Sequence, residues 1–404
     1  MQKNSPSMWI ATREMEAGGS NRRVVVVGGG LAGALLAKRL QFDANVVLID
    51  SKEYYEIRRA SSRCMVEPSF ADRTLIPHTD YLANCRVTSS PAIDVTDTEV
   101  LTAEGRSFVY DYLVIATGHA VEHCATKTRK QRLEQFHQGS NFIATSRSPP
   151  TNLSLDFNVL MVSIADNERI RSSSSVLIIG GGRTGVELAA EIAVDFPGKK
   201  VTLVHESSRL LQVLGPNASQ KVLKWLKSKG VDVVLDQSID VESIAEGDTS
   251  FTTSSGARIT AACHFRCVGR PMGSSWLNKT VLNDKLDRFG RLAVDANLRV
   301  RGTKNIFAIG DITDAAGRSG SLAHQHAAVA AKNLKLLLKG GREEKLAMYK
   351  PSYSSPAVVS LGRRQAVVQL SFATIKGHIP GWLQSKDSYV AWNRRQMGLE
   401  SETN

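Results

Sequence analysis

The chain has 404 residues, enough for two or three domains, and its composition of 42% hydrophobic and 22% charged residues is typical of a folded globular protein. No apolar run approaches the roughly 18 residues of a membrane-spanning helix, and residues 1–21 lack the apolar core of a signal peptide. The formal net charge of +12 is scattered along the chain, which disfavours nucleic acid as a partner. We expect a cytoplasmic protein with a disordered leader over residues 1–21.

The first predicted element is a strand at 24–27 that runs into a glycine motif with the spacing Gly28-x-Gly30-x-x-Gly33. Gly28 permits a tight turn, Gly30 lets the backbone approach a pyrophosphate, and Gly33 allows a helix to pack closely on the strand. Free N–H groups at the start of that helix then bind the phosphates. The next strand ends at Asp50, an acid at the spacing expected to accept hydrogen bonds from a ribose. These residues predict a complete dinucleotide site.

Three arginines follow the second strand. A guanidinium in this segment can clamp an anionic cofactor, and we predict that role for Arg63. We interpret Arg58 and Arg59 as a solvated basic helix face. A strand at 112–115 and the turn Ala116-Thr117-Gly118 complete this half of the chain.

A linker predicted over 121–171 is longer than most connections within a compact domain. Within it, 139–164 combines a Ser- and Pro-rich stretch with a short apolar run, and it interrupts a helix predicted over 129–138 and 165–171. We interpret 139–164 as an insertion or a gene-model artefact. Its deletion is expected to leave folding unchanged.

A second copy of the strand and glycine motif reads VLIIGGGRTG and contains Gly180, Gly182 and Gly185. The strand that follows it ends at His205, with Glu206 next. An acid at this point favours NAD and repels the 2′-phosphate of NADP, whereas a histidine permits either. The sequence therefore leaves the donor open between NADH and NADPH.

The helix after this motif, predicted over 184–196, carries Glu187 in its first turn. A carboxylate gains there from the helix dipole. Glu187 therefore either stabilises the helix end or lies near a nicotinamide.

A later strand, KNIFAIGD, ends at Asp311, which can accept a hydrogen bond from a polyol such as ribityl. A helix is predicted over 322–339, and its first turn, with His324 and His326, would aim backbone donors at an electron-accepting carbonyl. The two histidines are two residues apart and so face different sides of a helix. We predict no metal site.

Five cysteines form no C-x-x-C pair, which fits a reducing compartment and disfavours disulfide reduction. The tail predicts strands at 357–361 and 366–372, followed by a stretch in which apolar and basic residues alternate. Such mixing suits a peripheral membrane contact or the mouth of a lipophilic substrate site. Ordinary packing against the first domain explains it almost equally well.

In their joint order, these motifs resemble the FAD-dependent pyridine-nucleotide oxidoreductases, and more closely the apoptosis-inducing-factor-like and ferroptosis-suppressor-like branch. The resemblance covers about residues 22–399. It rests on VVVVGGGLAG, IDSK at 49–52, ATG at 116–118, GGGRTGVELAAEI at 180–192, VTLVH at 201–205, CVGRP at 267–271, IFAIGD at 306–311 and YKP at 349–351.

The resemblance implies an α/β fold with two Rossmann-like dinucleotide-binding domains, the second inserted in the first, and a small C-terminal α+β segment. The implied FAD-binding domain comprises 22–120 and 290–345, the NAD(P)-binding domain 172–289 and the C-terminal domain 346–404.

The family pattern places FAD in the first domain, with Asp50 on its adenosine ribose and Asp311 on its ribityl chain. NADH or NADPH occupies the second domain, where Glu187 helps seat the nicotinamide as the catalytic residue. The expected cofactor-binding residues are Gly28, Gly29, Gly30, Leu31, Ala32, Gly33, Asp50, Lys52, Arg63, Ser90, Thr117, Gly118, Gly180, Gly182, Gly185, His205, Glu206, Gly310, Asp311 and His326.

The expected function is transfer of a hydride from NAD(P)H to FAD and of electrons onward to a quinone that enters beside the C-terminal segment. One alternative is a flavin reductase of a small redox protein or of an ascorbyl radical, because a fold does not determine its acceptor. An alternative of another class is a FAD-stabilised signalling or nucleic-acid-binding protein.

Overall fold

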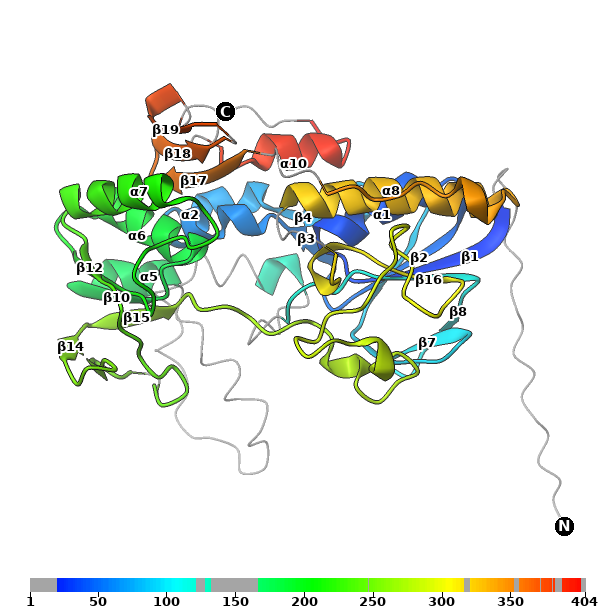
Figure 1. Ribbon diagram of the computed structural model, residues 1–404, viewed down its shortest axis with the longest axis horizontal. Coiled ribbons are helices and arrows are strands. Elements are labelled where there is room, and N and C mark those ends of the chain that lie inside the picture. The colour runs from blue at the N-terminus through cyan, green and yellow to red at the C-terminus, as the bar shows by residue number, and fades with distance from the viewer. Residues whose placement is uncertain are drawn as a thin grey trace, which may run out of the picture.

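The computed structural model describes residues 20–120, 128–131, 166–245, 247–315, 320–351, 356–370, 372–379, 381 and 387–400. The expected leader, except for its last two residues, and the expected insertion at 139–164 lie outside this described part. Two lobes stand side by side, each built on a parallel sheet, and a C-terminal sheet and helix lie across the top of both (Figure 1).

The first lobe is built on a five-stranded sheet with the order β16-β9-β1-β2-β5 and parallel pairing throughout. Residues 24–27 of β1, together with β9 and β16, are continuous apolar runs that are buried on both faces, as a parallel sheet requires, whereas the edge strand β5 is partly exposed. Helices α1 and α8 pack against each other above this sheet (Figure 1). The elements are β1 (Ser20–Val27), α1 (Leu31–Leu40), β2 (Ala44–Asp50), β5 (Arg86–Ser89), β9 (Tyr112–Ile115), β16 (Ile306–Ala308) and α8 (Gly320–Leu338).

The second lobe repeats this plan with a four-stranded parallel sheet in the order β12-β11-β10-β15. It comprises α5 (Asp166–Ser172), β10 (Ser175–Ile179), α6 (Arg183–Asp195), β11 (Lys200–Val204), α7 (Pro216–Ser228), β12 (Asp232–Val234), the hairpin β13 (Ser250–Thr252) and β14 (Arg258–Thr260), and β15 (Cys263–Arg266). Because β16 pairs with β9 after this lobe, the chain leaves the first sheet and later returns to it. The predicted α/β fold with two parallel sheets is confirmed.

Smaller elements complete the molecule. In the first lobe these are β3 (Tyr54–Glu56) paired with β4 (Leu75–Pro77), α2 (Ser61–Val66), and the antiparallel sheet of β6 (Ala92–Val95), β7 (Glu99–Thr102) and β8 (Ser107–Val109). The C-terminal sheet contains β17 (Ala357–Leu361), β18 (Gln365–Gln369) and β19 (Thr374–Gly377), and α10 (Val390–Gln396) follows it. The strand at 357–361 lies where the sequence predicted it, whereas the next strand ends at 369 and a third, β19, was not predicted.

Acidic side chains spaced four residues apart on α6 hold the lobes and the C-terminal sheet together. Glu187 accepts the Ser360 N–H of β17 at 3.1 Å. Glu191 accepts two hydrogen bonds of 2.8 Å from Arg63 of α2, and both side chains of this ion pair are 3% exposed. A third acid, Asp195, pairs with Arg363 in the turn after β17 at 2.6 Å. The spacing of four places these carboxylates on one helix face.

Candidate cofactor and acceptor site

A cavity of about 1170 Å³ starts at the carboxyl ends of β1, β2 and β9 and continues to β17 and α10. Ligands of open parallel sheets bind at this edge of the strands. Its lining residues include most of those predicted for the first cofactor: Gly28, Gly29, Gly30, Leu31, Ala32, Asp50, Lys52, Ser90, Thr117, Gly118, Gly310 and Asp311.

The first glycine motif forms a cradle with no room for side chains except at the ligand position. Gly28 has φ +106°, and a Cβ there would lie 2.6 Å from the Ala116 carbonyl oxygen. A Cβ on Gly33 would lie 1.9 Å from the Gly28 oxygen, so this glycine serves helix packing and does not line the cavity. By contrast, Gly30 faces open space at the N-cap of α1, where free N–H groups are suited to bind phosphate.

Asp50 lies behind this cradle at the end of β2. It accepts the Gly29 N–H at 2.7 Å and the Lys52 N–H at 3.0 Å. Burial by itself would raise the pKa of the Asp50 carboxyl, but His78 and Lys52 outweigh it and hold the pKa below its ordinary value. Asp50 is therefore an ionised acceptor, as ribose recognition needs.

Three other polar residues line the cavity along the same edge of the sheet: Asp311 after β16, Thr117 after β9, and Ser90 after β5 on the Asp50 side. Asp311 lies 3.4 Å from Nδ1 of His119, a cavity-lining residue that the sequence analysis missed although it follows the predicted turn directly. Oγ of Ser90 and Oγ1 of Thr117 are buried and hydrogen-bond to nothing within the described chain. Buried hydroxyl groups without a protein partner normally bind a ligand or water. The polar part of the cavity therefore fits a polyhydroxylated cofactor such as FAD.

His326 does not line the cavity, which corrects the expectation that it contacts the cofactor. Its Nδ1 accepts the Gly310 N–H at 3.0 Å, and its ring packs edge-on against Tyr349. Burial lowers the pKa of His326 to about 4, so the ring is neutral and able to accept. His326 holds the Gly310 turn in place, and Ala323 is the residue of α8 that reaches the cavity.

Arg63 is a second correction. The side chain is buried against Glu191 of the other lobe instead of lining the cavity, because α2 turns it toward α6. Arg58 and Arg59, interpreted from the sequence as a solvated face, do line the cavity. The Arg59 guanidinium lies 4.7 Å from the centre of the Tyr389 ring.

The second glycine motif repeats the backbone geometry of the first. Gly180 has φ +113°, and a Cβ on Gly185 would lie 1.9 Å from the Gly180 oxygen. A Cβ on Gly181 would meet the His205 ring at 2.7 Å, just as one on Gly29 would meet Asp50. An imidazole therefore takes the place of the carboxylate in the second lobe. Burial lowers the pKa of the His205 imidazole.

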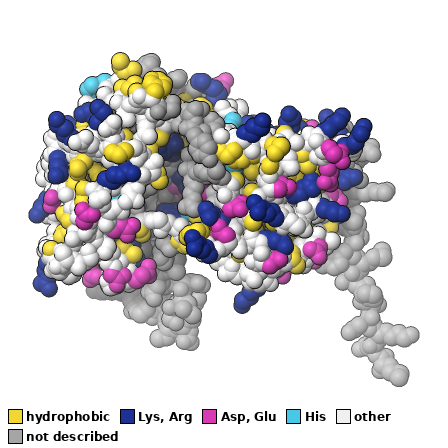
Figure 2. Space-filling model, in the orientation of Figure 1, with side chains coloured by type: hydrophobic (Ala, Val, Ile, Leu, Met, Phe, Trp, Pro, Cys, Tyr) yellow, Lys and Arg dark blue, Asp and Glu magenta, His cyan; other side chains and the backbone are white. Residues whose placement is uncertain are grey.

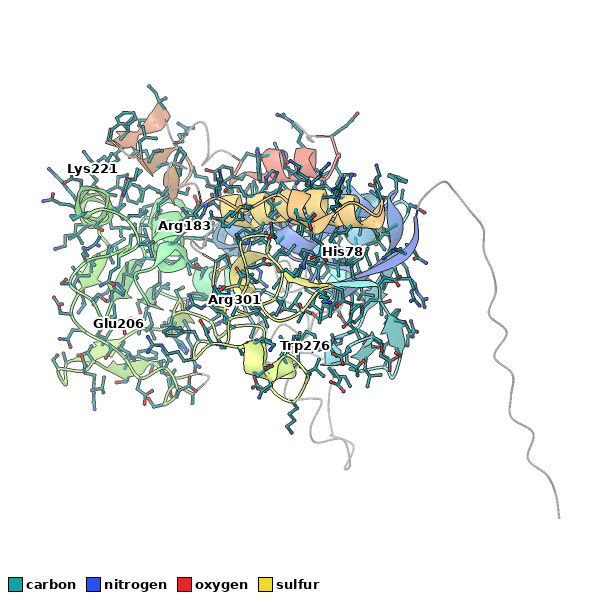
Figure 3. All side chains as sticks on the ribbon, turned by 45° about the vertical axis from the view of Figure 1, so that its right-hand side comes forward. His78, Arg183, Glu206, Lys221, Trp276 and Arg301 are labelled. Carbon is teal, nitrogen blue, oxygen red and sulfur yellow. The ribbon has the colours of Figure 1, made fainter. Side chains whose placement is uncertain are left out.

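The remaining predicted residues of the second lobe lie along the start of α6 and the end of β11. Gly182 is the N-cap of α6, with open space around it, and Glu206 is exposed. Glu187 is buried and does not line the large cavity, but Arg183, one turn before it, does. Figure 3 shows Arg183 between the lobes, with Glu206 in the second lobe and His78 in the first.

An apolar wall extends the cavity beyond the glycine cradle toward the C-terminal segment, and most of it had no specific signal in the sequence. Its residues are Leu211, Val213, Leu214, Ala357, Val359 and Trp392. Of these only Trp392 belongs to the mixed apolar and basic stretch noted in the tail. None of the four described cysteines, Cys64, Cys85, Cys263 and Cys267, lines the cavity.

The described part of the chain contains neither a metal-binding cluster nor a membrane-spanning helix. No group of three or more His, Cys, Asp or Glu side chains could hold a metal ion. No helix in the same part of the chain is long and apolar enough to cross a membrane.

The fold, with a glycine motif at the end of a parallel strand in each lobe, is that of a protein with two dinucleotide-binding domains. The chain belongs to the pyridine nucleotide-disulphide oxidoreductase family, whose model matches residues 22–331. It is 28% identical to apoptosis-inducing factor homolog B of Dictyostelium discoideum, over 87% of this chain and 90% of the relative. It is 27% identical to human ferroptosis suppressor protein 1, over 93% of this chain and 95% of the relative.

Solved structures show the same fold. The sulfide:quinone oxidoreductase of Aquifex aeolicus superposes with a TM-score of 0.70 and 17% identity, covering 93% of this chain and 92% of its own. NDH2 of Plasmodium falciparum in complex with NADH gives a TM-score of 0.66 and 14% identity, covering 94% of this chain and 97% of the NDH2 chain. The chain is thus a flavoprotein oxidoreductase that uses FAD and NAD(P)H, as the resemblance implied.

Proposed function

We propose that the protein is a NAD(P)H:quinone reductase. In the net reaction NAD(P)H gives up a hydride, one proton is taken from solvent, and the quinone becomes a quinol. The observation that carries this proposal is the apolar and aromatic wall that continues from the FAD cradle to the C-terminal segment, with no described cysteine along it.

Bound FAD supplies the electron chemistry, and the protein supplies binding, orientation and electrostatics. We assign the pyrophosphate to the N-terminus of α1 at Gly30, the adenosine ribose to Asp50 and the ribityl chain to Asp311. Support comes from the free N–H groups of α1, the ionised state of Asp50, and the unpartnered hydroxyls of Ser90 and Thr117.

We assign the acceptor to the part of the apolar wall that Leu211, Val213 and Trp392 form. Val213 is 93% exposed and yet lines the cavity, which places an apolar residue at its mouth. An apolar ring entering there exchanges water for aliphatic and aromatic surface. The arginines that line the same cavity, Arg58, Arg59 and Arg183, would attract an anionic acceptor such as ascorbyl, so the acceptor screen compares the two classes directly.

We assign the donor to the second lobe, with Gly182 at the pyrophosphate and Glu187 at the nicotinamide. Support for Glu187 comes from its place on α6, four residues after the cavity-lining Arg183 and therefore on the same helix face. Burial raises the pKa of Glu187, and Arg183 and the Ser360 N–H counteract it only in part. A carboxylate at this position can accept a hydrogen bond from the carboxamide nitrogen of a nicotinamide.

We expect NADH to be preferred over NADPH, because Glu206 is exposed beside His205 and repels a 2′-phosphate. In E206S the ratio of kcat/KM for NADPH to that for NADH should rise about tenfold, since a like-charge contact of ordinary strength is removed. A variant ratio equal to that of the parent protein would remove Glu206 from donor selection.

An anaerobic acceptor screen tests the function. The purified protein should be yellow, lose its flavin absorbance with NADH, and regain it when a short-chain ubiquinone or menadione is added. Recovery with a small redox protein or ascorbyl radical but with neither quinone would assign the chain to the alternative flavin reductases. Protein that never takes up flavin would overturn the cofactor assignment too.

A further inference from the structure

A buried histidine stands directly behind the Asp50 carboxylate in a position that the electron-transfer proposal does not use. His78 opens a short 3-10 helix, His78–Asp80, after β4 and is 0% exposed. Its Nε2 lies 3.6 Å from Oδ2 of Asp50, and it makes no hydrogen bond within the described chain. His78 also packs against the glycine cradle, since a Cβ on Gly29 would lie 2.6 Å from its ring.

Tyr81 determines which nitrogen of the His78 ring carries the proton. Nδ1 of His78 lies 2.6 Å from the Tyr81 hydroxyl, and Tyr81 is itself 4% exposed. Burial, with a smaller contribution from Asp50, raises the pKa of Tyr81 well above its ordinary value, so the hydroxyl keeps its proton. When the hydroxyl donates to Nδ1, the ring proton is on Nε2 and points at an acceptor.

From this geometry we infer that His78, fixed by Tyr81, is a positioning residue for FAD that orients Asp50 toward the adenosine ribose. Oδ1 of Asp50 accepts the Lys52 N–H and the Ser51 hydroxyl, and Oδ2 accepts the Gly29 N–H, so a ring N–H of His78 behind Oδ2 restrains the carboxylate from turning away from the cavity that it lines. Figure 3 shows His78 inside the first lobe, away from the Arg183 side of the molecule. His78 does not line the cavity, so it acts on the cofactor indirectly, through the groups in front of it.

The choice between FAD and FMN isolates this role, because FMN lacks the adenosine ribose that Asp50 recognises. Holoprotein is equilibrated with increasing FMN, desalted, and the ratio of retained FAD to FMN is measured. In H78N the amide occupies the Nδ1 position and cannot reach Asp50, whereas in H78Q the amide reaches the Nε2 position. We expect the preference for FAD over FMN to fall severalfold in H78N, because the 3.6 Å contact with Oδ2 of Asp50 is lost, and to be largely restored in H78Q.

Three further variants control the experiment. Y81F should shift the preference in the same direction but less, and it tests the inference even if H78N fails to hold flavin. H264N removes another buried histidine, whose ring packs on Phe251 in the second lobe, and should leave the preference unchanged. In a D50N background H78N should have no further effect.

An unchanged preference in both H78N and Y81F, or an equal loss in H78Q and H78N, would overturn the inference. The measurement includes neither NAD(P)H nor quinone. It depends on FAD binding and is independent of whether the acceptor assignment holds.

Discussion

Asp50 and His205 stand in the same relation to their glycine motifs, one beside Gly29 and the other beside Gly181, yet they differ in charge. The carboxylate is kept ionised, whereas burial lowers the pKa of the imidazole. The two lobes share one backbone plan, and in the proposed function this exchange and the exposed Glu206 let them recognise different nucleotides.

Gly29 is expected to tolerate no side chain. The Cβ of G29A would lie 2.2 Å from Oδ2 of Asp50 and 2.6 Å from the fully buried His78 ring, so the Asp50 carboxylate would have to move from the position assigned to ribose recognition. We expect the protein to purify with less than about a tenth of the parent's FAD, a loss equivalent to about 1.4 kcal/mol or more. The absorbance ratio of flavin to protein measures this. The control is G198A, in the turn after α6 and outside the cavity, whose Cβ would meet nothing within 4 Å, and equal losses in both variants would contradict the explanation.

His326 makes stability depend on pH. Its pKa is lowered from 6.5 to about 4 by burial, so the unfolded chain takes up a proton between these values that the folded chain refuses. Stability should therefore fall as the pH drops from about 6.5 to about 4, by as much as about 3 kcal/mol. Thermal unfolding across this range measures the effect.

H326N provides the control for this pH dependence, because its amide oxygen can still accept the Gly310 N–H but does not titrate. The fall in Tm between pH 6.5 and pH 4 should be smaller in H326N than in the parent. Parallel curves would contradict a role for His326.

Among the elements, α6 does most to hold the molecule together. Its face of Glu187, Glu191 and Asp195 contacts β17, α2 and the turn after β17, so one helix joins both lobes to the C-terminal sheet. This helix also explains why the predicted cofactor-binding role of Arg63 was wrong. From the sequence, an arginine in this segment and a glutamate 128 residues later have no visible relation, and only the docking of α2 on α6 pairs them.

Breaking this buried ion pair should destabilise the protein strongly. R63M leaves the Glu191 carboxylate buried without its partner, which costs about 3–5 kcal/mol. Thermal unfolding followed by flavin release should show a drop of roughly 10 °C. The double variant R63M/E191L should recover much of the loss, because no uncompensated charge remains. A double variant as unstable as R63M would show that packing, not charge, governs this contact.

For the whole molecule, the C-terminal segment presents apolar side chains next to basic ones. Phe372 and Ile379 are 86% and 79% exposed and flank the exposed Lys376, and hydrophobic side chains gather there at the top of the molecule (Figure 2). Helix α7, with Lys221 and Lys224 exposed, packs beside β18 and β19. We propose that this surface contacts an anionic membrane, where a lipophilic quinone is found.

Co-sedimentation with phosphatidylserine-containing vesicles tests this surface. F372D/I379D should weaken vesicle binding about tenfold or more, because it removes two apolar anchors and adds two negative charges. F289D, at an exposed apolar residue of the first lobe, should bind like the parent. Binding by the parent that persists in high salt and is unaffected by F372D/I379D would contradict this assignment.

The sequence alone determined the two glycine motifs, the buried parallel strands and Asp50, because each depends on neighbours within a few residues or on a fixed spacing along the chain. It also placed Asp311 and the Thr117 turn at strand ends. The tertiary structure decided that Arg63 pairs with Glu191, that His326 turns inward to Gly310, and that His78 stands behind Asp50. These are contacts between segments distant in sequence, and their geometry depends on how the lobes and helices dock, which no local pattern encodes.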